Sequence, residues 1–158
     1  MQVRHFEEPD AQALADLMIE MAGFYGAVIR SELVVAEDVV RQAQEVDVIV
    51  AHDDACLLGF ATFTSLYPVA GLLAFTYVQQ IYVGQAARRL GVAQELMAGI
   101  ARAAKAAGST RIEWSTSREN TAARSLYDSL GASGSDKVYY VLDGAALERL
   151  ATRGRQGT

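Results

Sequence analysis

The chain has 158 residues, of which 51% are hydrophobic and 21% charged, and this composition is typical of one folded domain and excludes an intrinsically disordered chain. The net charge of −5 argues against a general nucleic-acid binder, because a phosphate backbone requires a basic surface. One cysteine excludes an internal disulfide and, with two histidines, provides no metal-ligand cluster of recognisable spacing, so we expect a reducing, cytoplasmic location and no metal.

A short strand and two helices are predicted first. Residues 3–6 have a strand pattern, and Glu8-Pro9-Asp10 is typical of a helix start, with proline and acids in the first turn. The helix is predicted to continue to Tyr25, because apolar residues recur at helical spacing: Leu14, Leu17, Met18 and Met21. Asp16 and Glu20 interrupt this apolar run, so no export signal is predicted. A shorter helix is predicted over residues 37–44.

Three consecutive strands are predicted in the middle of the chain. Residues 47–51 are mostly β-branched, and the polar run His52-Asp53-Asp54 suits the turn before residues 57–67. A turn over residues 68–71 leads to the third strand, residues 73–83. The span 55–87 carries no charge, but its proline, glycines and paired glutamines favour two buried strands over a membrane-spanning helix. We therefore expect an antiparallel centre and no membrane partner.

The second half alternates helices and strands. A helix over residues 88–107 is predicted to bury one stripe: Leu90, Ala93, Met97, Ile100, Ala101 and Ala104. A strand at 110–116, a helix from Asn120 to Gly131, a strand at 137–142 and a helix at 144–150 follow, and the polar residues 152–158 are expected to fray. The elements predict one mixed α/β (α+β) domain over residues 1–151, with helices flanking a largely antiparallel sheet.

The start of the helix at residue 88 indicates an anion site. Its sequence is Arg88-Arg89-Leu90-Gly91-Val92-Ala93, in which a glycine and an alanine allow a ligand to approach the unpaired N–H groups of the first turn. These donors, the helix dipole and the two arginines favour a phosphate. The alternative interpretation is close packing of the helix on the sheet for the small residues and a solvated first turn for the arginines.

With the elements placed, the chain resembles the GNAT superfamily of N-acetyltransferases over nearly its whole length. The residues at 88–93 match that family's signature, and Asn120, Ala123, Tyr127 and Leu130-Gly131-Ala132 follow at a family-like distance. The resemblance implies acetyl-CoA as co-substrate. It implies that the strand residues Ile81, Tyr82 and Val83 pair with the pantetheine arm, and that the phosphates are held at Arg88, Arg89, Leu90, Gly91, Val92, Ala93 and Gln94.

The resemblance also assigns roles to two residues of the second motif. Tyr127 matches the tyrosine that protonates the leaving thiolate, whereas the alternative is that it only fills the core beside Leu126. Asn120 matches a cofactor contact, and it is equally suited to capping the helix. The implied reaction is direct transfer to a neutral amine, with a backbone N–H near Ile81 or Tyr82 steadying the oxyanion.

Within the superfamily, the chain resembles the diamine acetyltransferase branch in its length, its strand at 75–83 and its ending Tyr140-Val141-Leu142-Asp143-Gly144. That branch carries an adjacent pair of acids where this chain has Gln79-Gln80. Glutamine supplies neither charge nor a base, so Gln79 and Gln80 either contact the acceptor or only bridge strands. Glu113 is a candidate base beside the acceptor, and its alternative is a solvent-facing strand residue.

The sequence thus predicts an acetyl-CoA-dependent transfer to the primary amine of a small molecule in a ternary complex. The alternative is a non-catalytic acyl-CoA-binding or sensing domain, favoured by the missing acids. The acceptor is expected to be chosen by residues 23–35, and Tyr139 and Tyr140 on an edge strand would support a homodimer.

Overall fold

The structure is a computed structural model that describes residues 1–27, 36–54, 56–69 and 72–153. They form two compact units, Met1–Ser117 and Arg118–Thr158. Parts of the expected acceptor segment, of the turn at 68–71 and of the polar tail lie outside the described residues. The elements are β1 (Gln2–His5), η1 (Glu8–Asp10), α1 (Ala11–Phe24), α2 (Ala36–Gln42), β2 (Asp47–His52), β3 (Leu57–Val69), β4 (Leu73–Val83), η2 (Gln85–Ala87), α3 (Val92–Ala106), β5 (Ile112–Glu113), α4 (Thr121–Ser129) and α5 (Gly144–Thr152).

The described strands form one sheet in the order β1-β2-β3-β4-β5. The first four strands pair antiparallel with their neighbours, whereas β5 pairs parallel with β4. The three central strands are those predicted from the β-branched and apolar runs, joined by short connections as expected. The predicted fold class, a mixed and largely antiparallel sheet flanked by helices, is therefore confirmed.

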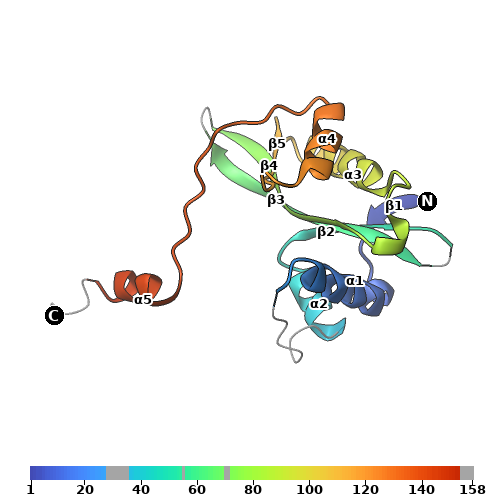
Figure 1. Cartoon of the computed structure of the whole chain (residues 1–158), viewed down its shortest axis with the longest axis horizontal. Coiled ribbons are helices and arrows are strands. Elements are labelled where there is room, and N and C mark those ends of the chain that lie inside the picture. Colours follow the sequence, from blue (N-terminus) through green and yellow to red (C-terminus); the bar gives the residue numbers. More distant parts are fainter. Residues whose placement is uncertain (28–35, 55, 70–71, 154–158) are drawn as a thin grey trace. The chain divides into compact units, whose positions relative to one another are not determined.

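Helices cover both faces of this sheet, with α3 on one side and α1 and α2 on the other (Figure 1). Under α3, Phe63 of β3 packs with Leu96 and Ile100, and on the opposite face Phe60 packs with Leu14 and other residues of α1 and α2. The helix α3 lies close to the sheet at Gly99, where a Cβ would lie 2.8 Å from Val3. Each face thus buries its own apolar stripe.

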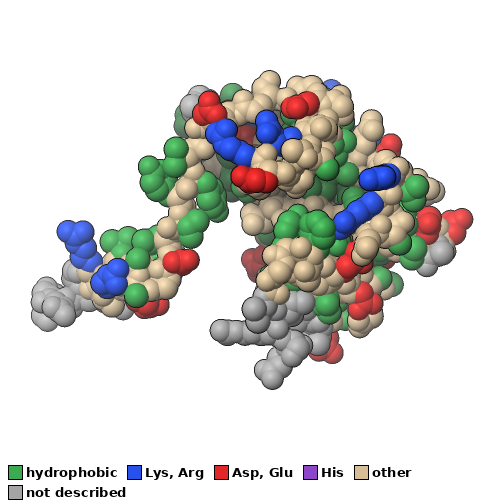
Figure 2. Space-filling model, in the orientation of Figure 1, with side chains coloured by type: hydrophobic (Ala, Val, Ile, Leu, Met, Phe, Trp, Pro, Cys, Tyr) green, Lys and Arg blue, Asp and Glu red, His purple; other side chains and the backbone are tan. Residues whose placement is uncertain are grey.

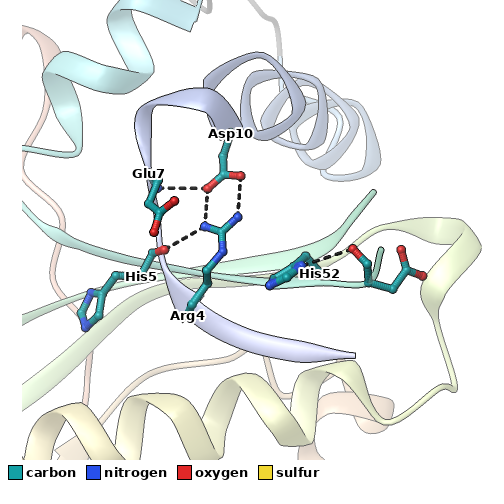
Figure 3. A network of polar contacts seen from close by, with 6 residues as sticks. Arg4, His5, Glu7, Asp10 and His52 are labelled. Carbon is teal, nitrogen blue, oxygen red and sulfur yellow. Dashed lines mark hydrogen bonds and ion pairs between the residues drawn. The ribbon is translucent and has the colours of Figure 1, made fainter. Parts of the chain in front are cut away.

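An ion pair fixes the connection from β1 to α1 (Figure 3). The Arg4 guanidinium donates two hydrogen bonds to the Asp10 carboxylate, at 2.6 and 2.9 Å, and a third to the carbonyl of His5. The Glu7 N–H also donates to Asp10, at 3.0 Å, which closes a capping box at η1. The Arg4 hydrogen bonds, opposed by partial burial, hold the pKa of Asp10 below its ordinary value.

The predicted start and buried stripe of the long helix are corrected by the structure. The helix begins at Val92 instead of Arg88, because Arg89 and Gly91 adopt left-handed backbone angles that interrupt a helix. Leu90 therefore precedes the helix and is 65% exposed, and Ala101 is also exposed. The stripe that is buried consists of Val92, Leu96, Met97, Gly99, Ile100 and Ala104.

The predicted strand at residues 137–142 is not formed. The structure has no strand there, and side chains from Val138 to Leu142 are 49–89% exposed. A strand is stable only when it pairs with a neighbour, and no described strand pairs with this segment. The predicted strand at 110–116 shortens to Ile112–Glu113 for a related reason, since only these residues pair with β4. None of the helices described here has the length and apolarity that a membrane crossing requires.

Candidate functional site

The connection between β4 and α3 presents a row of backbone donors. Gly91, with φ of 80°, caps α3 and no side chain caps it. The first amides of the helix, those of Val92, Ala93 and Gln94, have no acceptor among the described residues. Such amides stand at the positive end of a helix of 15 residues. The connection therefore presents the unbonded backbone donors on which the expected anion site depends.

The packing alternative for Gly91 does not hold in the structure. A Cβ built on Gly91 would meet nothing within 4 Å, so its small size is not needed against the sheet. By contrast, a Cβ at Gly59 would lie 2.5 Å from the carbonyl oxygen of Tyr82, and there glycine is required for packing. At Gly91 the glycine instead allows the left-handed angle and leaves open space over the helix start.

The two arginines of this connection have different surroundings. The Arg88 guanidinium lies 4.4 Å from the ring centroid of Phe24 and donates to the hydroxyl of Tyr82 at 3.3 Å. It is thereby directed towards α1. Arg89 is exposed, and no described residue forms an ion pair or side-chain hydrogen bond with it. Of the two positive charges predicted for the phosphate site, that of Arg89 is the one without a protein partner in the described part of the chain.

The second half of β4 has a free edge. β5 pairs with β4 only at Thr76 and Tyr77, so no described strand continues beside β4 beyond that point. The Gly84 N–H donates to the carbonyl of Leu58 on the β3 side. Because backbone groups alternate in direction along a strand, the N–H and C=O of Ile81 and Val83 face the open edge, whereas those of Tyr82 face β3. The Val83 carbonyl accepts a hydrogen bond from Arg88 Nε at 3.4 Å, so Ile81 and the Val83 N–H are the groups that could pair with an extended ligand.

A β-bulge separates the two halves of β4. Its register with β3 shifts after Thr62, which faces Gln80, whereas Phe63 faces Val78, and Gln79 is the additional residue. Gln79 is exposed, while Gln80 is half-buried and its amide donates to Met21 Sδ at 3.0 Å. The two glutamines predicted at the acceptor therefore differ, since Gln80 contacts α1 and Gln79 is accessible.

Glu113 lies in β5, opposite Tyr77 of β4. It is half-buried rather than facing solvent fully, and its carboxylate accepts a hydrogen bond from Arg111 Nε at 2.7 Å. The Arg111 guanidinium also lies 5.1 Å from the ring centroid of Phe75. Glu113 is thus an ionic group at the point where β4 and β5 separate.

A contact from α1 to this connection was missed at the sequence level. The Glu20 carboxylate accepts hydrogen bonds from the Tyr82 hydroxyl at 2.9 Å and from the Gln85 N–H at 2.7 Å. Burial raises the pKa of Tyr82, and its hydrogen bond to Glu20 raises that pKa further. Tyr82 is therefore a neutral donor at physiological pH. In the sequence Glu20 only interrupts an apolar run, and nothing local indicates its partner.

The residues of the second motif belong to the unit Arg118–Thr158. Asn120 caps α4, since its side-chain oxygen accepts a hydrogen bond from the Ala123 N–H at 3.2 Å, so the capping role is confirmed. Tyr127 is half-buried in α4. Gly131, with φ of 79°, ends the helix as predicted, and the Ala132 N–H donates to the carbonyl of Tyr127.

Two other surface features are separate from the helix start. A cavity of about 240 Å³ lies at the opposite end of α3, where Phe63, Thr76 and Ala104 are among its lining residues. On the face shown in Figure 2, acidic and basic side chains are interspersed. This pattern differs from the continuous basic surface that nucleic acids require.

Comparison with known proteins supports the family resemblance. Residues 12–132 match the family model described as "Acetyltransferase (GNAT) family". An integron cassette protein from the mobile metagenome of V. cholerae has a similar structure, with 26% identity, a TM-score of 0.77 and coverage of 95% of this chain and 96% of that chain. A comparison with proteins of curated function finds no match.

Two solved acetyltransferases share the fold at lower identity. One is a ribosomal-protein-alanine N-acetyltransferase from Brucella melitensis biovar Abortus 2308, with 23% identity, a TM-score of 0.71 and coverage of 91% of this chain and all of that chain, 100%. The other is the aminoglycoside N-acetyltransferase AAC(6')-Iy in complex with CoA, with 21% identity, a TM-score of 0.69 and coverage of 91% and 100%. GNAT proteins use acetyl-CoA. Because the family model covers most of the sequence, the chain belongs to the GNAT acetyltransferase family.

Proposed function

We propose that the protein transfers the acetyl group of acetyl-CoA to a primary amine of a small molecule by direct transfer in a ternary complex. The observation that carries the proposal is the helix start at Gly91, where open space lies above amides that have no acceptor among the described residues. The family match from residue 12 to residue 132 includes both sequence motifs, which supports treating residues 1–151 as one acetyltransferase domain.

The residues present fit acetyl-CoA in two places. The amides from Arg89 to Gln94, with the charge of Arg89, would hold the diphosphate at the positive end of α3. The free edge of β4 would pair with the amides of the pantetheine arm through Ile81 and the Val83 N–H, since the Val83 carbonyl accepts a hydrogen bond from Arg88 Nε. Tyr82 contributes differently from its neighbours, since its hydroxyl is bonded to Glu20 and its backbone faces β3. We propose Asn120 as a further cofactor contact.

In the proposed mechanism acetyl-CoA supplies a thioester carbonyl that a neutral amine can attack. The Ile81 N–H, directed to the open edge, would donate to the carbonyl oxygen as it becomes negative, and one such donor contributes roughly 3 to 4 kcal/mol. Tyr127 would give its hydroxyl proton to sulfur as the nitrogen–carbon bond forms and the carbon–sulfur bond breaks. The proton that the nitrogen loses passes to solvent, from which Tyr127 regains its own.

For the acceptor side, we propose Gln79 and Glu113 as the groups that meet the amine. Gln79 is exposed at the bulge, and a neutral amide recognises an amine by hydrogen bonding without selecting for a second positive charge. Glu113 supplies a negative charge beside β4, whereas Gln80 positions Gln79 by its contact with Met21. This arrangement favours monoamines over the polyamines used by the diamine branch.

The test is release of free coenzyme A thiol from acetyl-CoA in the presence of polyamines, amino acids, aminoglycosides and peptide N-termini. We expect turnover with at least one class, and Gln79→Glu is expected to raise kcat/KM for polyamines relative to monoamines. Gln80→Glu is the matched control, since its side chain contacts α1. Binding of acetyl-CoA without thiol release from any amine would identify a non-catalytic acyl-CoA-binding domain instead.

We also propose a cytoplasmic homodimer. Tyr139 and Tyr140 are 81% and 89% exposed, and adjacent exposed aromatic residues are enriched at protein contacts. Light scattering after size-exclusion chromatography should give twice the mass of 17.0 kDa, and Tyr139→Ser with Tyr140→Ser should give the monomer.

A further inference from the structure

One face of α1 lies along the start of the β4–α3 connection and contacts it at successive residues. Leu17 lies against Gly84, where a Cβ would be 3.1 Å from Leu17 Cδ2. One turn later, Glu20 accepts the Gln85 N–H at 2.7 Å. Another turn later, the Phe24 ring lies under the Arg88 guanidinium at 4.4 Å. The spacing of three and four residues places all of these α1 residues on one face of the helix.

We infer that α1 positions the acetyl-CoA site through the Phe24–Arg88 contact, and that Phe24 and Arg88 are positioning residues rather than cofactor ligands. This inference rests on the proposed function. Phe24 is 60% exposed and is the last residue of α1, so core packing does not explain an aromatic side chain there. Its ring also lies 6.3 Å from that of Tyr82, which receives a hydrogen bond from Arg88. The arginine is thus held between α1 and β4.

The contact with Phe24 holds the Arg88 guanidinium against α1, and not at the unbonded amides of the helix start. Arg88 Nε also donates to the Val83 carbonyl at 3.4 Å, which fixes the side chain along the end of β4. The next residue, Arg89, then takes the left-handed angle of 65° that leads to Gly91. That angle is unfavourable for a residue with a Cβ, so the surrounding contacts must maintain it. Loss of the Phe24 ring would release Arg88 and leave the amides of the helix start less ordered.

The end of α1 also links the proposed cofactor site to the choice of acceptor. The chain leaves α1 after Phe24 and enters the segment that we expect to choose the amine. A shift at the end of α1 would therefore change the cofactor connection, and cofactor binding would in turn order the end of α1, since such coupling is reciprocal.

The experiment measures acetyl-CoA affinity by titration calorimetry for the whole chain. Phe24→Leu is expected to weaken binding by about two- to fivefold, the range for an exposed cation–π contact, and Arg88→Gln by a similar factor. The double variant should be no weaker than either single variant, because both remove one contact. Phe24→Trp should retain affinity, and Tyr67→Leu, an aromatic side chain 68% exposed in β3, is the control expected to bind as the wild type does.

Hydrogen exchange provides a second measurement that a purely structural role would not change. Acetyl-CoA should slow exchange of the amides of Tyr25, Gly26 and Ala27 in the wild type, and Arg88→Gln should abolish this effect. Unchanged affinity in Phe24→Leu, with a wild type that binds acetyl-CoA, would overturn the inference and leave the proposed function intact. A wild type that does not bind acetyl-CoA would overturn both. If Phe24→Leu fails to fold, Arg88→Gln alone decides by the same two measurements.

Discussion

The connection from β4 to α3 and the unit Arg118–Thr158 each carry one motif of the GNAT resemblance, but they are built differently. The connection is bounded by buried residues, since Tyr82, Ala87 and Val92 are 4%, 5% and 1% exposed. In the second unit, no residue of the described range 118–153 is buried. The first motif is thus held by a core, whereas the second is held by local hydrogen bonds such as the cap at Asn120.

This difference separates binding from chemistry in the proposed mechanism. Residues of the first unit offer backbone donors whose directions follow from the sheet and from α3. The second unit carries Tyr127, whose hydroxyl is the proposed acid. We therefore expect substitutions in the β4–α3 connection to change mainly acetyl-CoA affinity, and loss of the Tyr127 hydroxyl to change mainly kcat.

The largest effect is expected for Tyr127→Phe. Removal of the hydroxyl should lower kcat by about 100-fold, the lower range for a general acid, because sulfur would leave without a proton. The KM for acetyl-CoA should change little, which thiol-release kinetics at varied acetyl-CoA will measure. Tyr139→Phe, in the same unit and 81% exposed, is the matched control. An unchanged kcat for Tyr127→Phe would contradict the division between binding and chemistry.

The next effect is expected for Gly91→Val. A β-branched residue at φ of 80° is strained by about 1–3 kcal/mol, and its side chain would occupy the open space above the helix start. Acetyl-CoA affinity measured by calorimetry should fall at least about tenfold. Gly108→Val is the control, because Gly108 has φ of 74° and open space at the other end of α3. Equal loss of affinity in both variants would show that strain alone, and not the site, is responsible.

The sequence predicted the features that depend on local pattern. Strands β2 to β4, the helix after them and the cap at Asn120 follow from hydrophobic spacing, turn residues and capping chemistry, and the structure confirms them. The predicted helix start, Arg88, lies four residues before Val92, where α3 begins. An arginine with φ of 65° is rare, and no spacing rule indicates that Arg89 adopts it.

Features that depend on contacts distant in sequence were not predicted. The bond from Glu20 to Gln85 joins residues 65 apart, and the bulge at Gln79 is defined only by the register of β4 with β3. The strand expected at 137–142 had the right composition, yet strand formation requires a partner that composition cannot specify. The contacts of Arg88 with Phe24 and Tyr82 likewise depend on residues that its local sequence does not indicate.

A smaller effect within the connection is expected for Arg89→Gln. Loss of a charge without a partner among the described residues should weaken acetyl-CoA binding by about fivefold, equivalent to about 1 kcal/mol for a solvent-exposed contact. The variant should also bind with a weaker dependence on salt, which separates a lost ionic contact from a disturbed backbone. Arg102→Gln, in the body of α3, is the control. A loss of affinity that is the same at low and high salt would contradict a direct contact between Arg89 and phosphate.

The smallest effect concerns the stability of the first unit, which contains the buried core. Asp10→Asn removes the charge that accepts two hydrogen bonds from Arg4, and the free energy of unfolding should fall by about 1 kcal/mol at pH 7. Thermal unfolding should show a decrease of about 2–4 °C. Asp136→Asn breaks the Arg118–Asp136 pair of the second unit, whose side chains are 81% and 95% exposed, and should change stability by less than about 0.3 kcal/mol.

The stabilisation of the folded chain by Asp10 depends on pH. The hydrogen bonds from Arg4 lower the pKa of Asp10 in the folded chain, so the folded state binds this proton less readily than the unfolded state. The stabilisation is complete above the unfolded pKa of about 3.9 and is lost as pH falls through the lower folded value. The wild type and Asp10→Asn should therefore differ most at neutral pH and converge in acid, once the pH is below the lowered pKa of Asp10 in the folded chain. A difference that persists in acid would indicate that shape at this position, and not charge, stabilises the connection from β1 to α1.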